Sequence, residues 1–391
     1  MIKAKTLFAF ILVIMVGCTK NEKFHLKQER NDYAYELFSK AKNEKNIDRK
    51  LELLNLANNK IKSKEDTLLF DILDYQIYYH DAKKSYDSSL YYANEMINIA
   101  AKINDTSNLA KGYYRKARTF LYLNKHEQVL ENMYRSQSLY KSIHDSVKVG
   151  RRLVELANAQ VRLGDFTGSH QTATDALNYI AKDDSIFLAS VHTLLGLTSS
   201  KMDDYETSIK ENKEALNYVK SHNDSLVILN NIGVNYRRIG NFIKSDEVFE
   251  KALSKAQDSI RMTRSLKDNY YYNQYLKSGK NVIPELEEIA LQRQNSNDTE
   301  GLLSSYYHLS SIYQEYDLSK SRKIAQQYLS TAKAFGNPLE QLKALEILIQ
   351  LNKEDAGRIY AKEYFSLNDS ITTARNKIKN LFAKIKFDEE Q

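Results

Sequence analysis

Residues 229–252 of this 391-residue chain read LNNIGVNYRRIGNFIKSDEVFEKA. Apolar and small side chains recur at steps of three and four on both sides of Gly240-Asn241, which is typical of two amphipathic helices joined by a tight turn. Gly233 and Ser245 are small enough to let two helices approach closely, and Phe249 is expected to fill the space between successive hairpins. The stretch therefore predicts a helical hairpin that cannot bury its apolar face alone.

An Asp followed by Ser or Thr recurs along the chain, mostly at steps of 39 or 40 residues. The pairs are Asp66-Thr67, Asp105-Thr106, Asp145-Ser146, Asp184-Ser185, Asp224-Ser225, Asp258-Ser259, Asp298-Thr299 and Asp369-Ser370, with Asn337-Pro338 in the last interval. These side chains accept hydrogen bonds from the free amides of a starting helix, so each pair predicts a helix N-cap. A fixed period of this length indicates a helical repeat array whose units stack on their neighbours.

The residue order in 229–252 resembles the tetratricopeptide repeat (TPR), with a large residue, then Ile-Gly, then Tyr, and a small residue four places before Phe. Weaker copies of this register lie on both sides of it. The resemblance implies an all-α fold, a right-handed superhelical solenoid of about eight or nine TPR-like hairpins. We expect the solenoid over 32–369 and a C-terminal helix over 370–391.

The composition suits a nearly continuous helical chain. There are only 2 prolines and 12 glycines, and 28 tyrosines stand beside no tryptophan. Tyrosine is therefore expected to take the large aromatic packing positions, with its hydroxyl at a wet edge. The net charge of +7 is modest and 50 acids are mixed with the basic residues, so we expect no nucleic-acid surface.

The N-terminus resembles a bacterial lipoprotein signal. Lys3 and Lys5 precede an apolar run over 7–16 that is too short to span a membrane, and Met15-Val16-Gly17-Cys18 resembles a lipobox. The resemblance implies a signal peptide over 1–17, lipidation of Cys18 and a tether over 18–31. It also implies attachment to a membrane of a Gram-negative cell envelope through the lipid alone, facing the periplasm or the exterior. A plain secretory signal or a buried thiol is the alternative for Cys18.

The sequence contains no pattern typical of catalysis. The 8 histidines are scattered, and no paired-His or Cys-x-x-Cys spacing, nucleophile elbow or phosphate-binding glycine loop occurs. We therefore expect neither an enzyme nor a cofactor or metal.

The TPR resemblance implies that the first helix of each hairpin lines a concave groove. Carried over position by position, the groove residues are Tyr114, Arg118, Asn158, Arg162, Lys201, Asn230, Arg237 and Arg238. This polar to basic set suits a protein or peptide ligand, in particular an acidic peptide or a chain terminus, because arginine binds carboxylates with two hydrogen bonds. A solvated helix face is the alternative interpretation of the same residues.

Six of the Asp-Ser/Thr pairs are followed by an apolar residue, a triplet that resembles an O-glycosylation acceptor of exported proteins in some Gram-negative bacteria. The acceptors would be Thr67, Ser146, Ser185, Ser225, Ser259 and Ser370. Helix starts produce the same triplet without any modification, because the apolar periodicity resumes after the cap.

The order of lipobox, long-period hairpins and helical tail is similar to the sensor half of TPR-containing bacterial histidine kinases and regulators. The sequence has no membrane helix after the signal and no output motif. We therefore expect a lipid-anchored scaffold that binds a protein or peptide in its groove. The alternative is a sensory module that relays ligand binding to a separate partner through its C-terminal helix. In that helix an apolar seam from Ile371 to Ile385 fits either a capping helix or a short coiled coil.

Overall fold

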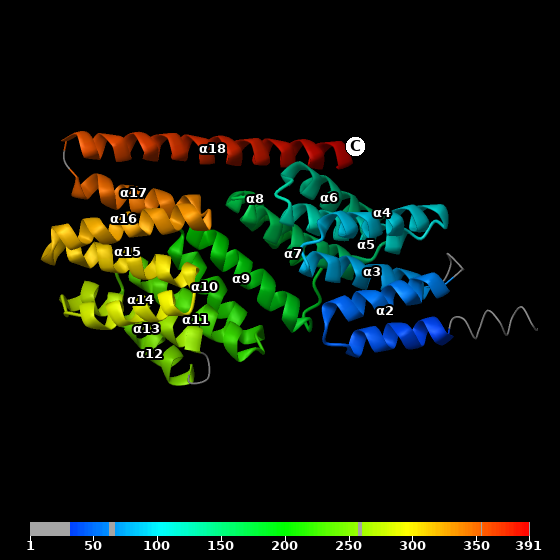
Figure 1. The fold of residues 1–391 in the computed structure, drawn as a ribbon, viewed down its shortest axis with the longest axis horizontal. Coiled ribbons are helices and arrows are strands. Elements are labelled where there is room, and N and C mark those ends of the chain that lie inside the picture. Colours follow the sequence, from blue (N-terminus) through cyan, green and yellow to red (C-terminus); the bar gives the residue numbers. More distant parts are fainter. Residues whose placement is uncertain (1–31, 62–66, 257–259, 353, 391) are drawn as a thin grey trace, which may run out of the picture. The chain divides into compact units, whose positions relative to one another are not determined.

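The computed structural model describes residues 32–61, 67–256, 260–352 and 354–390. In these ranges every regular element is an α-helix and no strand occurs (Figure 1). The predicted signal peptide, Cys18 and tether lie outside the described residues, and so do Asp66, Asp258 and Ser259. Within the described part of the chain, no helix combines the length and the apolar character that crossing a bilayer requires.

The chain divides into two compact units, Met1–Lys148 with Ile385–Gln391 (unit 1) and Val149–Lys384 (unit 2). Unit 1 contains a helix over 32–43 and then α2 (Ile47–Lys60), α3 (Thr67–Ala82), α4 (Tyr86–Lys102), α5 (Thr106–Tyr122) and α6 (His126–Ser142). The helices of unit 2 are α7 (Ser146–Arg162, which starts just before the boundary), α8 (Phe166–Ala176), α9 (Ser185–Lys201), α10 (Tyr205–Tyr218), α11 (His222–Arg238), α12 (Phe242–Lys255), α13 (Ile260–Ser278), α14 (Ile283–Asn295), α15 (Thr299–Tyr316), α16 (Leu318–Phe335), α17 (Pro338–Leu351) and most of α18 (Glu354–Glu390). In both units successive helices pack on each other, which confirms the predicted solenoid of helical hairpins.

The predicted caps hold at five described helix starts. Asp105, Asp145, Asp184, Asp298 and Asn337 each accept a hydrogen bond from the backbone N–H three residues later, at 3.0, 3.0, 3.4, 3.3 and 3.2 Å. Four of them follow a residue in the left-handed region, such as Asn104 or Asn297. Asparagine tolerates this conformation, so the preceding helix ends and the next one starts within about three residues.

The cap predicted at Asp224-Ser225 is wrong. Helix α11 starts one turn earlier, because the Ser221 hydroxyl accepts the N–H of Asp224 at 3.3 Å and Ser221 has the extended conformation of a cap. The Ser225 hydroxyl instead donates to the carbonyl oxygen of His222 at 2.7 Å. Two residue types that both cap well stand three positions apart, and the first of them sets the helix start.

In the hairpin of α11 and α12, a serine on the second helix makes a hydrogen bond to the first helix. The Ser245 hydroxyl donates to the Gly233 carbonyl oxygen at 2.8 Å, and a Cβ on Gly233 would lie 2.6 Å from the Phe249 ring. The same link recurs from Ser169 to Ala157 at 2.7 Å and from Ser208 to the carbonyl of residue 196 at 2.6 Å. These serines therefore add a buried hydrogen bond to the close approach that their small size permits.

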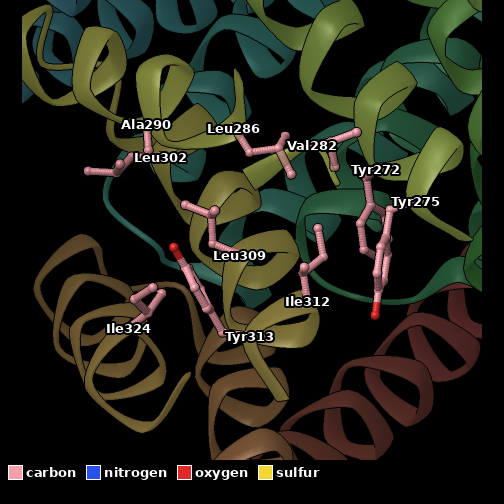
Figure 2. Close-up of a cluster of buried hydrophobic side chains, with 10 residues drawn as sticks. All are labelled: Tyr272, Tyr275, Val282, Leu286, Ala290, Leu302, Leu309, Ile312, Tyr313 and Ile324. Atoms are coloured by element: carbon pink, nitrogen blue, oxygen red, sulfur yellow. The ribbon is translucent and has the colours of Figure 1, made fainter. Parts of the chain in front are cut away.

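Tyrosine takes large packing positions, as the composition predicts. Figure 2 shows a core of unit 2 in which Tyr272, Tyr275 and Tyr313 lie among aliphatic side chains. Tyr313 is 6% exposed, and its hydroxyl donates to Glu287 at 2.8 Å. The ring is thus buried while the hydroxyl reaches a polar group at the edge of the core.

Helix α18 is a single helix of 37 residues. It passes through residue 370 without a break, so the helix start predicted at Asp369-Ser370 is wrong, and the boundary expected between 369 and 370 falls inside a helix. Both side chains are exposed on this helix, where water satisfies them and no cap is required. Tyr360, Tyr364 and Leu367 pack against the core formed by α15, α16 and α17.

Candidate functional site

The groove residues predicted from the sequence fall in both units. Tyr114 and Arg118 belong to unit 1, and Asn158, Arg162, Lys201, Asn230, Arg237 and Arg238 belong to unit 2. The two sets are therefore described separately.

In unit 1 the basic face of α5 meets carboxylates on α3. Arg115 donates to Asp74 at 2.8 Å, and the Lys111 ammonium lies 3.2 Å from Asp74 and 3.8 Å from Asp71. Burial opposes ionisation of Asp74 most strongly, but the hydrogen bond and charge of Arg115 and the charge of Lys111 outweigh it and lower the pKa of Asp74. The cations of this face are therefore already neutralised by the protein itself.

Tyr114 and Arg118 of unit 1 contact other residues of the protein itself. Tyr114 is only 8% exposed, so its ring offers little surface to a ligand. The Arg118 guanidinium lies 6.0 Å from the centre of the Tyr114 ring and donates to the Tyr122 hydroxyl at 3.3 Å. Its charge also acts on Asp81, where it favours the ionised form against the larger effect of burial.

Two of the predicted residues of unit 2 stand on α7 and are exposed to solvent. Asn158 donates to the Val154 carbonyl of its own helix at 3.1 Å. Arg162 makes no ion pair within the part of the chain that the structure describes. Within the described ranges, neither residue has a hydrogen bond or ion pair with the other predicted residues of unit 2.

Arg237 on α11 is held by α13. It donates to the carbonyl and side-chain oxygens of Asn269 at 2.9 and 3.0 Å, and its guanidinium lies 5.1 Å from the centre of the Tyr272 ring. Asn269 also donates to the side chain of Asn230 at 3.0 Å. Burial is the main cause that lowers the pKa of Arg237 to about 10, and the neighbouring charge of Arg238 adds to it.

Two tyrosines continue this surface towards α17. The rings of Tyr272 and Tyr307 lie 6.2 Å apart in an edge-to-face arrangement, and the Lys343 ammonium lies 5.9 Å from the centre of the Tyr307 ring. Lys343 also pairs with Glu340 at 2.7 Å, and Glu340 accepts a hydrogen bond from the buried Tyr328. A cation thus stands at each end of a short aromatic floor.

Lys201 at the end of α9 is exposed to solvent. Its pKa is nevertheless lowered, first by burial among protein atoms and then by the positive charge of Lys343. The charges of Arg238 and Arg375 lower the pKa further, while Glu340 opposes them. Lys201 is therefore a solvent-exposed cation that feels the charges of Lys343, Arg238 and Glu340.

We call this surface the cationic groove. It is formed by Lys201, Asn230, Arg237, Arg238, Asn269, Tyr272, Tyr307 and Lys343. Four of these residues were predicted from the sequence. Among the described residues, no ion pair forms with Lys201, Arg237 or Arg238. The groove therefore presents positive charge that the protein does not neutralise.

The sequence analysis missed Asn269, Tyr272, Tyr307 and Lys343. A signal existed for Asn269, because it stands 39 residues after Asn230, one period further along the chain. The other three lie in repeats whose TPR register is weak, so their direction depends on how each hairpin stacks on the one before it.

A fully buried polar cluster supports the floor of the groove. Arg293 donates to Asp268 and to Ser305, both at 2.6 Å, and the His308 ring stacks on Tyr272 with their centres 4.0 Å apart. Burial is the main cause of the lowered pKa of His308, so this ring is neutral at pH 7. In the described residues, no group of His, Cys, Asp and Glu side chains is arranged to hold a metal ion.

No protein-family model and no curated protein matches this sequence. Solved structures do match the fold. The apo form of RapI has a TM-score of 0.64 at 11% identity, covering 91% of this chain and 99% of its own. The apo form of the quorum sensor NprR from B. thuringiensis has a TM-score of 0.61 at 13% identity, covering 83% and 94%. A Rap protein in complex with Competence and Sporulation Factor has a TM-score of 0.54 at 10% identity, covering 89% and 99%.

These similarities define the class of the protein. The chain is a TPR-like α-solenoid, and at such low identities the similarity establishes the fold alone.

Proposed function

We propose that the protein is a binding scaffold that holds an acidic segment of a protein or peptide in the cationic groove of unit 2. The observation that carries the proposal is the positive charge of Lys201 and Arg238, which form no ion pair among the described residues, together with the Lys343 ammonium 5.9 Å from the partly exposed Tyr307 ring. Two proteins that share the fold support it, because one is a quorum sensor and another was solved in complex with Competence and Sporulation Factor.

The groove offers three kinds of contact to an extended acidic ligand. Arg238 and Lys201 attract carboxylates, and arginine binds them with paired hydrogen bonds. The side-chain amide of Asn230 suits the ligand backbone, since its oxygen is already fixed by Asn269 at 3.0 Å. The partly exposed ring of Tyr307 takes an apolar or aromatic side chain. Stacked hairpins hold these groups in place before binding, which reduces the ordering cost of association.

A charge reversal tests the proposal. A fluorescent peptide with Glu at alternate positions is titrated with wild type and with Lys201→Glu/Arg238→Glu, and anisotropy is measured. The double variant is expected to lose at least thirtyfold in affinity, roughly 2 kcal/mol. The matched control is Lys210→Glu/Lys251→Glu, which changes the net charge equally at two exposed positions on second helices. Equal losses in both variants contradict a groove site and leave only non-specific attraction.

A sensory module that relays binding to a separate partner is the second candidate. The observation that favours it is Arg375 of α18, whose charge acts on Lys201 in the groove. An acidic ligand bound at Lys201 would therefore also act electrostatically on Arg375 of the C-terminal helix. Reconstitution with a partner kinase or regulator tests this candidate, since a scaffold without a relay leaves the partner's activity unchanged when the acidic peptide is added.

We propose that the protein is anchored to a membrane of the cell envelope through diacylated Cys18. The support is the lipobox resemblance and the position of this single cysteine directly after an apolar run. Cys18→Ala is expected to move the protein from the membrane fraction to the soluble fraction, and palmitate labelling of wild type checks the lipid directly.

We propose that Ser146 and Ser185 are the preferred O-glycosylation acceptors. Their apolar neighbours Val147 and Ile186 are 50% and 69% exposed. Core packing therefore does not account for the apolar residue of these two triplets. Of the other four acceptors, Ser225 and Ser370 are less favourable, while Thr67 and Ser259 remain predictions. Leu226 is fully buried next to Ser225, Ser370 lies inside α18, Thr67 is the exposed first residue of α3, and Ser259 lies outside the described residues.

Intact mass and peptide mapping of the native protein test the modification. Added hexose-type mass on peptides containing Ser146 and Ser185, lost in the double Ser→Ala variant, is the expected result. An unmodified mass for the native protein eliminates the idea.

A further inference from the structure

A cleft of unit 2 lies between the second helices of two successive hairpins. It has a volume of about 510 Å³ and is lined by α14, α15 and α16, together with Asp317 at the start of α16. Its residues all belong to unit 2, and none of them is part of the cationic groove. This volume is within the range of small-molecule sites in proteins.

The long sides of the cleft are formed by matching stripes of α14 and α16. Each helix contributes four residues at steps of three, one and three, from Glu287 to Gln294 and from Lys320 to Gln327. Seven residues of α-helix rise about 10 Å, which is the length of the cleft along these helices. Glu287 pairs with Lys320 at 2.7 Å, so an ion pair bridges the two helices and closes the cleft at this end.

The floor of the cleft is apolar. Ala290, Leu302, Leu309 and Ile324 line it and belong to the buried core of Figure 2, where Ala290 and Leu302 lie above Leu309 and Ile324 lies below it. Leu291 also lines the cleft, and 51% of its surface is exposed. A ligand with an apolar body therefore covers a large apolar side chain that otherwise contacts water, which favours binding.

One cation of the cleft is available to a ligand. Lys320 is held by Glu287, and its ammonium lies 4.4 Å from the centre of the Tyr313 ring. Asp317 accepts the N–H of Lys320 at 2.9 Å, and the helix start that it caps compensates its charge. Lys323, one turn further along α16, is exposed and forms no ion pair among the described residues. The cleft thus offers a single free ammonium beside an apolar floor.

We propose that this cleft binds a medium-chain monocarboxylic acid, whose alkyl chain lies on the apolar floor and whose carboxylate pairs with Lys323. The single charge matches the one free ammonium, and the extended chain of octanoate is about as long as the cleft. Tyr306 and Gln327 also line the cleft and carry donors that suit the carboxylate oxygens. A helix of a partner protein fits less well, because the bridge of Glu287 and Lys320 blocks one end.

This inference goes beyond the proposed function, since the two sites share no residue and their ligands differ in chemistry. The test uses the full chain and isothermal titration calorimetry with octanoate, 1-octanol and acetate. Octanol keeps the chain without the charge, and acetate keeps the charge without the chain. The variants are Lys323→Gln, Gln327→Trp, which fills the cleft from an exposed position, and the control Lys251→Gln, which removes the same charge from an exposed position on α12.

Wild type is expected to bind octanoate about tenfold more tightly than octanol, the effect of one charged contact, and to show no measurable binding of acetate. Lys323→Gln is expected to remove this preference while its affinity for octanol stays within twofold of wild type. Gln327→Trp is expected to weaken both eight-carbon ligands about tenfold, and Lys251→Gln neither. In wild type, octanoate is expected to slow backbone hydrogen exchange over 287–294 and 320–327, because it contacts both helices.

Several results overturn the assignment. Equal affinities of wild type for octanoate and octanol show that the cleft does not read the carboxylate. A loss of octanoate affinity in Lys251→Gln as large as in Lys323→Gln shows general attraction to a basic protein. Protection from exchange outside α14, α15 and α16 shows that octanoate binds elsewhere. If wild type binds the acidic peptide but not octanoate, this site is refuted while the cationic groove stands. Circular dichroism of each variant checks that the helices remain folded.

Discussion

The first-helix faces of the two units carry similar residues and use them differently. In unit 1, Lys111 and Arg115 are paired with Asp71 and Asp74 on the preceding first helix. In unit 2, Lys201 and Arg238 form no such pairs among the described residues. The comparison shows that a basic residue on a first helix is paired where the preceding repeat carries a carboxylate opposite it, and stays unpaired where it does not.

The difference can be found in the sequence at the repeat period. Asp71 and Asp74 stand 40 and 41 residues before Lys111 and Arg115. Val161 stands 40 residues before Lys201, at the corresponding step. Carboxylates one period upstream thus predict a self-neutralised face, and their absence predicts a face open to anions.

Removing the carboxylate in unit 1 has the largest expected effect. Asp74 is 8% exposed and holds Arg115, so Asp74→Asn leaves a largely buried guanidinium without its counter-charge. The free energy of unfolding is expected to fall by about 2–3 kcal/mol, since breaking a buried pair from one side is costly. Denaturant unfolding measures the loss, and hydrogen exchange locates it in α3 and α5.

The matched variant in unit 2 is Lys201→Gln. It removes a cation that has no ion pair, so unfolding is expected to change by no more than about 0.5 kcal/mol. Equal destabilisation by both variants contradicts the distinction between paired and unpaired faces.

The parts of the structure that the sequence predicts are those that depend on local chemistry. Caps such as Asp105 and Asn337 form where an Asp or Asn side chain directly precedes a helix, and the close contact of Gly233 with Phe249 follows from a small residue at a fixed register. Asp224 was predicted wrongly because Ser221 caps the same helix one turn earlier. Here two local signals competed, and sequence position alone did not decide between them.

The groove was predictable only in part. Lys201, Arg237 and Arg238 were found because the register is clear from α9 to α12. Lys343 joins them through the stacking of later hairpins, which brings it to the Tyr307 ring and which no local pattern encodes. To predict where residues so far apart in the sequence lie, one needs the angle between each hairpin and the next, because these angles add up along the stack.

Adding a carboxylate to unit 2 is the converse experiment and is expected to have a smaller effect. Val161→Asp places an acid one period before Lys201, as Asp71 stands before Lys111. The new pair is expected to weaken binding of the acidic peptide about tenfold, since it neutralises the groove from within. Anisotropy measures the affinity. Val161→Asn is the control, and an equal loss in this uncharged variant shows that shape and not charge is responsible.

The paired face of unit 1 is expected to respond to acid, and the cationic groove of unit 2 to alkali. The pKa of Asp74 is lowered in the folded state, so its pairing stabilises the protein above the ordinary aspartate pKa and is lost as pH falls through the folded value. The pKa of Lys201 is lowered and that of Arg237 is about 10, so the groove loses positive charge as pH rises towards 10. Acidic-peptide affinity is therefore expected to fall about fivefold between pH 8 and pH 10.

Each pH effect has its own variant as a control. Asp74→Asn is expected to remove the part of the stability loss below pH 4 that comes from this pair. Lys201→Gln is expected to flatten the alkaline fall in affinity. An affinity that stays constant up to pH 10 in wild type means that the groove cations do not contact the ligand.

The smallest expected effect compares a residue that caps in unit 1 with one that does not in unit 2. Asp105 accepts the N–H of Asn108 at 3.0 Å at the start of α5, the helix that carries the paired cations. Asp224 lies in the first turn of α11, where Ser221 already serves as the cap. Asp105→Ala is expected to cost about 1 kcal/mol, and Asp224→Ala a few tenths through the helix dipole alone. Denaturant unfolding of the two variants measures the difference, and a larger loss at Asp224 would show that the identical Asp-Ser/Thr signal caps both helices after all.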